Sequence, residues 1–288
     1  MLRILLLGSS GFLGSKVYYN LKKNKNLKIF HVGLIKKKCD LSIYNNLKKV
    51  IFNSKPDLII NASGMVNIDK CEVQSKKSKI INVKLLENIF KIKKINNFEY
   101  DLIQLSTDQI YDKSSKRASK EIDKIKINNL YSKHKYMAER ICIKNNSLVL
   151  RVNFYGNSKK NNSFLNWVYN SFKSKKGFYL FNDVFFNPLS VSTLAKIIKK
   201  IVEKKLYKKK NIINLGTKDG VYKHLLAIDF ANRKGIYNNN YSLTPVNKFS
   251  KVKKSKNMFM DVKKVEKMLN IRMPSSNSEI NRVLKEFT

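Results

Sequence analysis

The 288-residue sequence predicts an α/β fold: a Rossmann-type doubly wound parallel sheet with a small C-terminal substrate-binding lobe. Apolar runs of strand length alternate with helical patterns through the first half, which is typical of a parallel sheet covered by helices. Three glycines spaced three residues apart, Gly8, Gly11 and Gly14, follow the first apolar run. A hydrophobic content of 43% supplies a core for one large domain with an attached lobe.

The elements of the first half follow from their residue patterns. Short apolar runs predict strands at residues 3–7, 28–34, 58–61, 102–106 and 148–152. Apolar residues at helical spacing predict helices at residues 12–23, 41–52, 79–93 and 130–145. Because right-handed crossovers join parallel strands, we expect any ligand to lie at the carboxyl ends of the strands.

The second half is less regular. Its pattern predicts a helix at 192–205, a strand at 211–215 and helices near 222–233 and 261–269, around a polar stretch at 238–255. We expect residues 1–155 to form the Rossmann core, with 182–216 returning to it. Residues 156–181 and 217–288 would form the substrate-binding lobe over the edge of the sheet.

The formal net charge of +39 raises the question of nucleic-acid binding. Only seven of the 59 basic residues are arginine, the residue that contacts phosphates and bases with a bidentate fork. The lysines are spread over almost every segment beside many Asn and Ile residues, as AT-rich codon usage would produce. We therefore expect a solvated lysine surface and no nucleic-acid partner, with a positive field that helps to capture an anionic substrate.

The apolar segments and the cysteines predict a cytoplasmic protein without a membrane partner. No stretch approaches the roughly 18 apolar residues of a transmembrane helix. The N-terminal apolar run is too short for a signal peptide and ends in a glycine loop, so we expect a buried strand. Cys39, Cys71 and Cys142 are odd in number and far apart, which fits a reducing compartment and excludes a disulfide framework or a cysteine zinc site.

The glycine loop predicts a dinucleotide site, so that the Rossmann core would bind NAD(P). Gly8 would allow the tight turn, Gly11 would let the backbone approach a pyrophosphate, and Gly14 would permit close packing of helix on strand. The helix that begins at Phe12 then presents free N–H groups to the phosphate. The alternative is an ordinary strand–helix turn.

The end of the second predicted strand decides between the two coenzymes. It reads His31-Val-Gly-Leu-Ile-Lys36-Lys-Lys38 and lacks the carboxylate that would favour NAD(H). Lysines there would bind a 2′-phosphate, so the sequence favours NADP(H) and leaves NAD(H) open, with His31 expected near the cofactor. Asp40, followed by Leu41, would meet the adenine or cap the next helix. Small residues at Ala62, Ser63 and Gly64 would leave room for the cofactor, unless they form a plain loop.

A tyrosine and a lysine one helical turn apart predict carbonyl chemistry. Tyr131 and Lys135 share a helix face, and the ammonium would lower the pKa of a phenol from its ordinary value of about 10. The lysine would also hold ribose hydroxyls, and Thr107 would hydrogen-bond the substrate carbonyl. The pair alone is common in a lysine-rich chain; its place after Ser106-Thr-Asp108 and a glycine loop favours hydride transfer. His134 is expected at the surface, and we assign no metal site.

These residues resemble the extended short-chain dehydrogenase/reductases, and most closely the branch of dTDP-4-dehydrorhamnose reductases and related sugar-nucleotide reductases. The matching segments are Gly8–Gly14, Cys39–Leu41, Asn61–Glu72, Asn82, Ser106–Asp108, Tyr131–Lys135 with Ala138-Glu139, and Leu150–Gly156. The resemblance implies Thr107, Tyr131 and Lys135 as the catalytic trio. It implies these cofactor contacts: Gly8, Gly11, Phe12, Leu13, Gly14, Asp40, Leu41, Ala62, Ser63, Gly64, Tyr131 and Lys135. Thr107, Asp108 and Phe154 would face the sugar.

The second half departs from the family pattern. The segment Asn182–Ser190 replaces an Asp-Gln-x-Gly-x-Pro-Thr motif, and Lys254-Ser255 replaces an Arg-Pro pair. These are substrate-lobe positions, so the identity of the sugar stays open, and the metal of some family members has no matching ligands here.

The resemblance implies NAD(P)H-dependent reduction of a 4-keto nucleotide sugar in surface polysaccharide biosynthesis, such as that of O-antigen. A homodimer is a possible assembly, and the sequence does not decide the oligomeric state. Two alternatives remain: an epimerase or dehydratase that recycles tightly held NAD, and a non-catalytic sugar-nucleotide-binding regulatory subunit.

Overall fold

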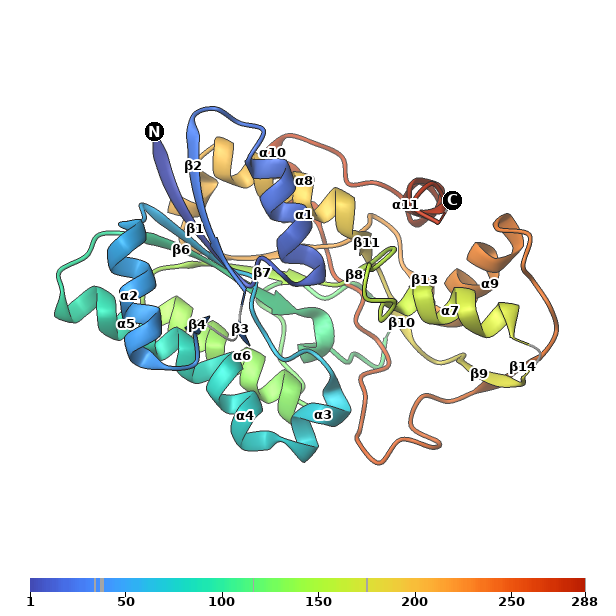
Figure 1. Ribbon diagram of the computed structural model, residues 1–288. Coiled ribbons are helices and arrows are strands. Elements are labelled where there is room, and N and C mark those ends of the chain that lie inside the picture. The colour runs from blue at the N-terminus through green and yellow to red at the C-terminus, as the bar shows by residue number, and fades with distance from the viewer. Residues whose placement is uncertain (34, 37–38, 116, 175, 288) are drawn as a thin grey trace. The chain divides into compact units, whose positions relative to one another are not determined.

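The computed structural model describes residues 1–33, 35–36, 39–115, 117–174 and 176–287 (Figure 1). The chain forms two compact units. Unit 1 consists of 1–107, 129–151 and 195–213, and unit 2 of 108–128, 152–194 and the described part of 214–288. The predicted division into a cofactor-binding core and a substrate-binding lobe concerns binding roles, and it stays a prediction.

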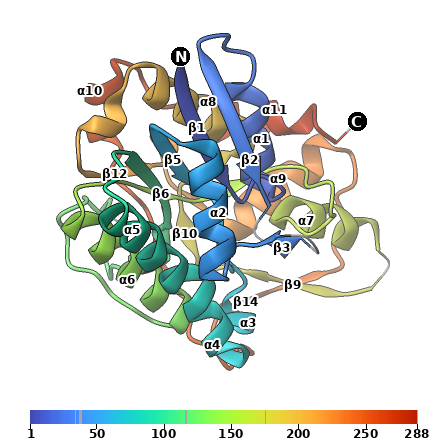
Figure 2. The same cartoon turned by 60° about the vertical axis from the view of Figure 1, so that its left-hand side comes forward.

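Unit 1 is built on a six-stranded sheet (Figure 2). In spatial order its strands are β12 (Ile212–Leu215), β7 (Leu148–Val152), β6 (Asp101–Thr107), β5 (Leu58–Asn61), β1 (Leu2–Leu7) and β2 (Leu27–Val32). The ladders β1–β2, β1–β5 and β5–β6 are parallel. Two short strands, β3 (Ile35–Lys36) and β4 (Cys39–Asp40), pair antiparallel outside this sheet. The predicted doubly wound α/β fold is confirmed.

Helices cover both faces of this sheet (Figure 1). They are α1 (Phe12–Leu21), α2 (Tyr44–Ser54), α3 (Ile68–Val73), α4 (Ser75–Lys79), the π-helical η1 (Ile80–Lys84), α5 (Leu85–Ile95), α6 (Leu130–Lys144), α8 (Val191–Glu203, in unit 1 from Ala195) and the short η3 (Leu206–Lys208). Helices α2, α5 and α6 lie on one face and α1 on the other. Their apolar stripes bury aliphatic side chains against the strands, among them Leu47, Ile51, Ile89 and Ile92 against Leu5, Ile59 and Leu102.

The element boundaries follow the sequence pattern where burial is periodic. Strands β5 and β7 have the predicted bounds. The helix predicted at 41–52 begins only at Tyr44, because Asp40 first forms a turn in which its Oδ1 accepts from the Ser42 N–H at 2.8 Å. The helix predicted at 79–93 is the end of a longer helical stretch that starts at Ser75 and passes through the π-helical segment.

Strand β1 is the point where the direction of winding reverses. It pairs with β2 on one side and β5 on the other, so the first crossover and the next leave it in opposite directions. In such sheets the loops at the carboxyl ends of these strands open a crevice for a ligand. The glycine loop after β1 and the small residues after β5 lie side by side at this edge of the sheet.

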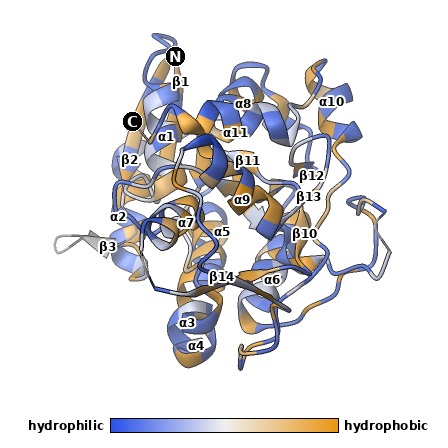
Figure 3. Ribbon diagram, turned by 90° about the vertical axis from the view of Figure 1, so that its right-hand side faces the viewer, coloured by the Kyte–Doolittle hydropathy of each residue, from blue (hydrophilic) through white to orange (hydrophobic). Residues whose placement is uncertain are grey.

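Unit 2 has short ladders and an aromatic core. Its strands pair as β8 (Phe154–Tyr155) with β11 (Leu189–Ser190), β9 (Phe178–Phe181) with β14 (Tyr241–Thr244), and β10 (Phe185–Phe186) with β13 (Val221–Tyr222). Its helices are η2 (Asp108–Ile110), α7 (Phe164–Lys173), α9 (Lys223–Arg233), α10 (Lys263–Leu269) and α11 (Ser276–Leu284). The core contains Tyr155, Phe172, Phe186 and Phe230. In Figure 3, α7 and α9 show both hydrophobic and hydrophilic residues, as helices with one buried face do.

Several elements of unit 2 were not predicted, among them the short strands β8, β9, β10, β11 and β13. Helices α7 and α11 went unrecognised, and β14 lies inside the stretch 238–255 that the sequence marked only as polar. None of the helices in the described part of the chain is both long and apolar enough to cross a membrane.

Candidate active site

The glycine turn after β1 is pressed against the loop after β5. Gly8 has a positive φ of +81°, and a Cβ there would lie 2.6 Å from the Ser63 nitrogen. A Cβ on Gly14 would lie 2.2 Å from the Gly8 oxygen. Side chains at these two positions would drive the loops apart, which is the physical reason for glycine in this turn.

The N-terminus of α1 suits an anion. Gly11 is its N-cap, no side chain caps the helix, and the first turn, Phe12–Ser15, all of it described, contains no acidic residue. The first N–H groups of a helix lack intrahelical acceptors and carry partial positive charge. A pyrophosphate fits this end of the helix, whereas the Leu13 side chain is buried and only its backbone is available to a ligand.

The predicted adenosine side is described only in part. Lys37 and Lys38 lie outside the described residues, as does the side chain of Lys36. Asp40 forms a turn before α2 but does not cap that helix, as the sequence had allowed, because the N-cap is Ile43 and no side chain caps it. Leu41 is fully buried in the core.

His31, at the end of β2, lies beside the glycine turn. Its ring packs on Tyr18 at 4.2 Å between centroids, and its Nδ1 lies 3.3 Å from the Ser9 hydroxyl. The imidazole therefore reaches the glycine loop, and its predicted position near a coenzyme stays a prediction.

The loop of small residues after β5, Ala62-Ser63-Gly64, lies against the glycine turn. The next residue, Met65, is clamped by the Asn82 side chain, which accepts from its N–H and donates to its carbonyl, both at 3.0 Å. Asn82 sits in the π-helical segment, so the irregular turn of that helix aims the clamp at the loop.

Thr107, Tyr131 and Lys135 lie on two packed elements of unit 1. Thr107 ends β6, and the other two lie in the first turns of α6, which packs against β6. All three are buried, at 4%, 7% and 4% exposure. The start of α6 is held by a capping box at Asn129 and by Glu72, whose Oε1 accepts from the Leu130 N–H at 2.7 Å. The family-matched Glu72 thus orients the helix that carries the tyrosine.

The buried ammonium of Lys135 has a hydrogen-bond acceptor on the backbone of β6. Its Nζ donates to the Leu105 carbonyl at 2.6 Å. Burial lowers the pKa of Lys135 from 10.5 to about 8, against the opposing pull of Glu139 and of the thiols Cys142 and Cys71. A lysine with this pKa is still largely an ammonium at neutral pH.

Glu139, one turn further along α6, is balanced by Arg151. The two form a buried ion pair at 2.7 Å, and the Ser106 hydroxyl donates to the same carboxylate at 2.5 Å. Their side chains are 0% and 2% exposed. These bonds join β6, α6 and β7 in the interior of unit 1.

Asp108 and Phe154 belong to unit 2, although Asp108 follows Thr107 directly. Asp108 is 1% exposed and accepts from the Asn153 amide. Phe154 begins β8 and pairs with Leu189. Their predicted contacts with a sugar stay a prediction.

Sequence reasoning missed Lys223 of unit 2. Its Nζ lies 4.8 Å from the centroid of the Phe164 ring and 5.7 Å from that of Phe181. Burial and the nearby Lys254 lower the pKa of Lys223 to about 8, while Asp108 opposes the shift. One lysine in so lysine-rich a chain gives no signal in the sequence.

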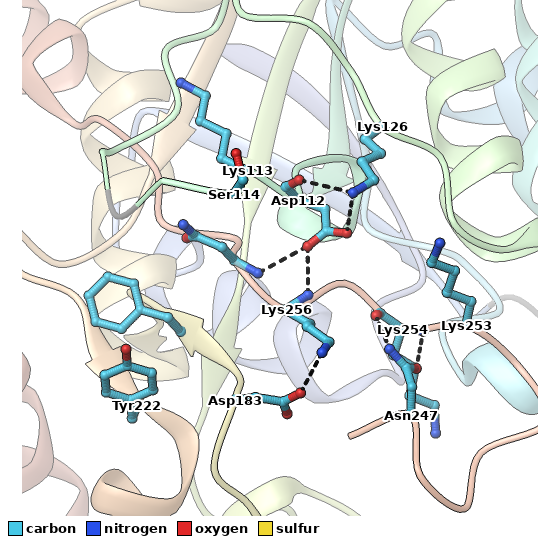
Figure 4. Close-up of a pocket in the computed structure, with 12 residues that line it drawn as sticks. Asp112, Lys113, Ser114, Lys126, Asp183, Tyr222, Asn247, Lys253, Lys254 and Lys256 are labelled. Atoms are coloured by element: carbon cyan, nitrogen blue, oxygen red, sulfur yellow. Dashed lines mark hydrogen bonds and ion pairs between the residues drawn. The ribbon is translucent and has the colours of Figure 1, made fainter. Parts of the chain in front are cut away.

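Unit 2 also contains a basic pocket of about 460 Å³ (Figure 4). Five lysines line it, together with Asp112, Asp183, an aromatic wall of Phe185 and Tyr222, and three further polar residues. Asp112 pairs with Lys126 and Asp183 with Lys256, both at 3.0 Å. Of the described residues that line the pocket, none is a predicted site residue, and one of them, Lys254, is the neighbour that helps to lower the pKa of Lys223.

The prediction that His134 lies at the surface is wrong. It is 5% exposed, and its Nδ1 lies 2.9 Å from the Ser78 hydroxyl, because α4 covers this part of α6. Among the residues that the structure describes, no three His, Cys, Asp or Glu side chains converge to hold a metal ion.

The family follows from a match over almost the entire chain. The family model of the RmlD substrate binding domain matches residues 2–288. The chain belongs to this family. The resemblance to the sugar-nucleotide reductase branch is thereby confirmed.

Curated relatives of this family member are distant. The spore coat polysaccharide biosynthesis protein SpsK of Bacillus subtilis is 20% identical over 204 residues, 70% of each chain. The dTDP-4-dehydrorhamnose reductase of Escherichia coli is 26% identical over 198 residues, 67% of this chain and 64% of that protein.

Solved structures extend the likeness of fold to the full length. A dTDP-4-dehydrorhamnose reductase from Clostridium acetobutylicum superposes with a TM-score of 0.88 at 20% identity over 99% of both chains. One from Bacillus anthracis, solved with NADP, gives 0.86 at 18% identity over 99% of this chain and 100% of that one. At these identities the superpositions show the fold.

Proposed function

We propose that the protein reduces a 4-keto nucleotide sugar of the dTDP-4-dehydrorhamnose type with NADPH, in surface polysaccharide biosynthesis. One observation carries the proposal: a buried lysine with a lowered pKa shares a helix face with Tyr131, beside the strand end that bears Thr107. The family and the named activity of the Escherichia coli relative support the same reaction.

The coenzyme would be held by unit 1. The N-terminus of α1 and the turn Gly8–Gly14 would bind the pyrophosphate, and Lys135 would hold ribose hydroxyls. The end of β2, His31-Val32-Gly33, offers no carboxylate to reject a 2′-phosphate, which supports NADPH. Bound NADPH would supply the hydride.

Tyr131, Lys135 and Thr107 would protonate the substrate oxygen and stabilise the groups that take part. As the keto carbon gains a hydride, its oxygen gains a proton from the Tyr131 hydroxyl, so that the ketone becomes an alcohol. The Lys135 ammonium stabilises the phenolate that remains, and the Thr107 hydroxyl donates a hydrogen bond to the substrate oxygen. Solvent then returns a proton to Tyr131.

Unit 2 would bind the rest of the substrate. We assign the sugar to Asp108 and Phe154, and the diphosphate charge to Lys223, whose ammonium lies among aromatic rings. We further propose that the protein acts in the cytoplasm, consistent with the buried free thiols of Cys71 and Cys142. A homodimer stays a prediction.

The proposal is tested with a panel of 4-keto nucleotide sugars and both coenzymes, followed by coenzyme absorbance and product NMR. We expect one NADPH oxidised per sugar reduced at C4, and slower turnover with NADH. Purified protein that carries stoichiometric NAD and consumes no added coenzyme would support an epimerase or dehydratase instead. Binding of the sugars without any turnover would support a regulatory subunit.

A further inference from the structure

The carbonyl that anchors Lys135 has a second side-chain partner. Leu105 O accepts from Lys135 Nζ at 2.6 Å and from Gln104 Nε2 at 2.7 Å. The ammonium and the primary amide therefore lie side by side on one acceptor. Any change in the amide changes both the direction of this carbonyl and the field at the ammonium.

The Gln104 amide is itself held from the other side. Its Oε1 accepts from Asn61 Nδ2 at 2.8 Å, across the paired positions of β5 and β6. Asn61 Oδ1 in turn accepts from the Ser63 N–H at 3.2 Å and from the Ser63 hydroxyl. The hydrogen bonds run without a break from Ser63 to Lys135.

The Ser63 N–H and the Leu105 carbonyl, at the two ends of this series of hydrogen bonds, determine the orientation of both side-chain amides. The Ser63 N–H can only donate, so Asn61 must turn its oxygen toward it and its NH₂ toward Gln104. The Leu105 carbonyl can only accept, so Gln104 must turn its NH₂ toward it. Neither amide can flip without facing two donors or two acceptors toward each other.

This series of hydrogen bonds is buried along its whole length. Exposure is 7% at Ser63, 3% at Asn61, 1% at Gln104 and 4% at Lys135. Buried polar groups held in this way specify one geometry, since an unmade bond cannot be replaced by water. Ser63 is also where the loop after β5 touches Gly8, so these hydrogen bonds connect the loop against the glycine turn to Lys135.

We propose that Gln104 is a positioning residue for Lys135. Its amide shares the Leu105 carbonyl with the ammonium, and Asn61, which also bonds Ser63 next to the glycine turn, holds that amide in place. The consequence for reduction rests on the function proposed above. The consequence for the titration of Lys135 does not.

The titratable groups around Lys135 in the described part of the chain include Tyr131, one turn before it on α6. Glu139 and Cys142 face Lys135 from its own helix and Cys71 from α3, and Arg151 on β7 pairs with Glu139. Burial raises the pKa of both thiols, so they are neutral at pH 7. A carboxylate placed at position 104 would therefore add a negative charge beside the ammonium.

The test compares Gln104→Glu and Gln104→Met with the wild-type protein. The pKa of Lys135 is measured by competitive acetylation across a pH series, with its peptide quantified by mass spectrometry. The alkaline limb of the reduction rate and the Kd of NADPH are measured on the same proteins. The control is Ile103→Val, a buried neighbour on β6 that carries no polar group.

We expect Gln104→Glu to raise the Lys135 pKa, and the alkaline limb with it, by about one pH unit or more. Gln104→Met should shift both by less and weaken NADPH binding several-fold, because the carbonyl loses its second donor. Ile103→Val should leave both unchanged.

An unchanged Lys135 titration in folded Gln104→Glu protein overturns the proposal. If circular dichroism shows that this variant does not fold, Gln104→Met decides: unaltered Lys135 titration and NADPH affinity overturn it. If the Lys135 titration shifts in the variants but the protein reduces no keto sugar, the positioning role is supported and the proposed function is rejected. If the protein reduces keto sugars but the Lys135 titration does not shift, only the positioning role is rejected.

Discussion

The two units satisfy their buried polar groups in different ways. In unit 1 long parallel ladders pair the backbone, and buried side chains bond one another, as Glu139 does with Arg151 and Asn61 with Gln104. Carboxylates accept from backbone N–H groups in both units, as Glu72 does in unit 1. In unit 2, where the ladders are short, such bonds hold loops: Asp183 accepts from Val246 N at 2.8 Å and Glu279 from Ser190 N at 2.6 Å. Since every buried N–H needs an acceptor, a unit with little sheet must use its acidic side chains for structure.

This difference bears on the proposed reaction chemistry. In unit 1 the proposed site residues Tyr131 and Lys135 lie on a helix that packs against the sheet. In unit 2, carboxylates such as Asp183 and Glu279 hold loops, and aromatic residues fill the core. We therefore expect substitutions of the buried polar groups of unit 1 to cost more than substitutions of polar groups in unit 2. Five predictions test this contrast.

The largest effect is expected from breaking the buried ion pair of unit 1. Arg151→Met leaves Glu139 charged and buried, so we expect a loss of about 3–5 kcal/mol in the free energy of unfolding, measured by urea titration. The double variant Glu139→Gln/Arg151→Met should recover most of it. Lys256→Met in unit 2, whose side chain is 52% exposed, should cost less than about 1 kcal/mol. Equal losses in the two units would contradict the contrast.

Removal of the phenol should affect turnover alone. Tyr131→Phe is expected to lower kcat at least about a hundredfold, since proton donation is lost while the ring still fills its site. NADPH affinity, measured by fluorescence titration, should stay near the wild-type value. Near-normal turnover would remove Tyr131 from the mechanism.

The pH dependence should report the buried lysine of unit 1. With a Lys135 pKa of about 8, kcat/KM should fall above pH 8, approaching tenfold per pH unit, because the protonated form is required. The contribution of Lys135 to folding stability changes with pH in the opposite direction. Between pH 8 and 10.5 the unfolded chain binds more protons at this lysine than the folded chain does, so the free energy of unfolding rises with pH.

Lys135→Met separates these two effects. At pH 7 it should raise the free energy of unfolding by on the order of 1–3 kcal/mol while abolishing turnover, because the cost of burying a charge disappears. The difference in stability from wild type should shrink as pH rises through 8 to 10.5. A constant difference across that range would contradict the assigned shift.

The smallest effect is expected from a substrate contact of unit 2. Lys223→Met should raise the KM for the nucleotide sugar about tenfold through loss of a charge-assisted hydrogen bond, with kcat and NADPH affinity unchanged. The control is Lys173→Met, an exposed lysine that lies 5.0 Å from the Tyr169 ring. A fall in kcat with unchanged KM would place Lys223 in the chemistry instead.

Sequence patterns predicted unit 1 closely and unit 2 poorly, for the same physical reason. The main helices of unit 1 bury periodic aliphatic faces and its central strands are continuous apolar runs, so β5 and β7 have the bounds that their residues predict. In unit 2, β14 is a strand because it pairs with β9. No local periodicity marks such a partner.

The sequence by itself determined the parallel α/β class, the glycine turn and the order of Thr107, Tyr131 and Lys135, because these depend on local spacing along the chain. Only the tertiary structure decided that His134 is buried, that Gln104 shares a carbonyl with Lys135, and that Lys223 lies among aromatic rings. Burial and hydrogen-bond partners come from segments far apart in sequence, and a residue type carries no record of the neighbour that folding brings to it.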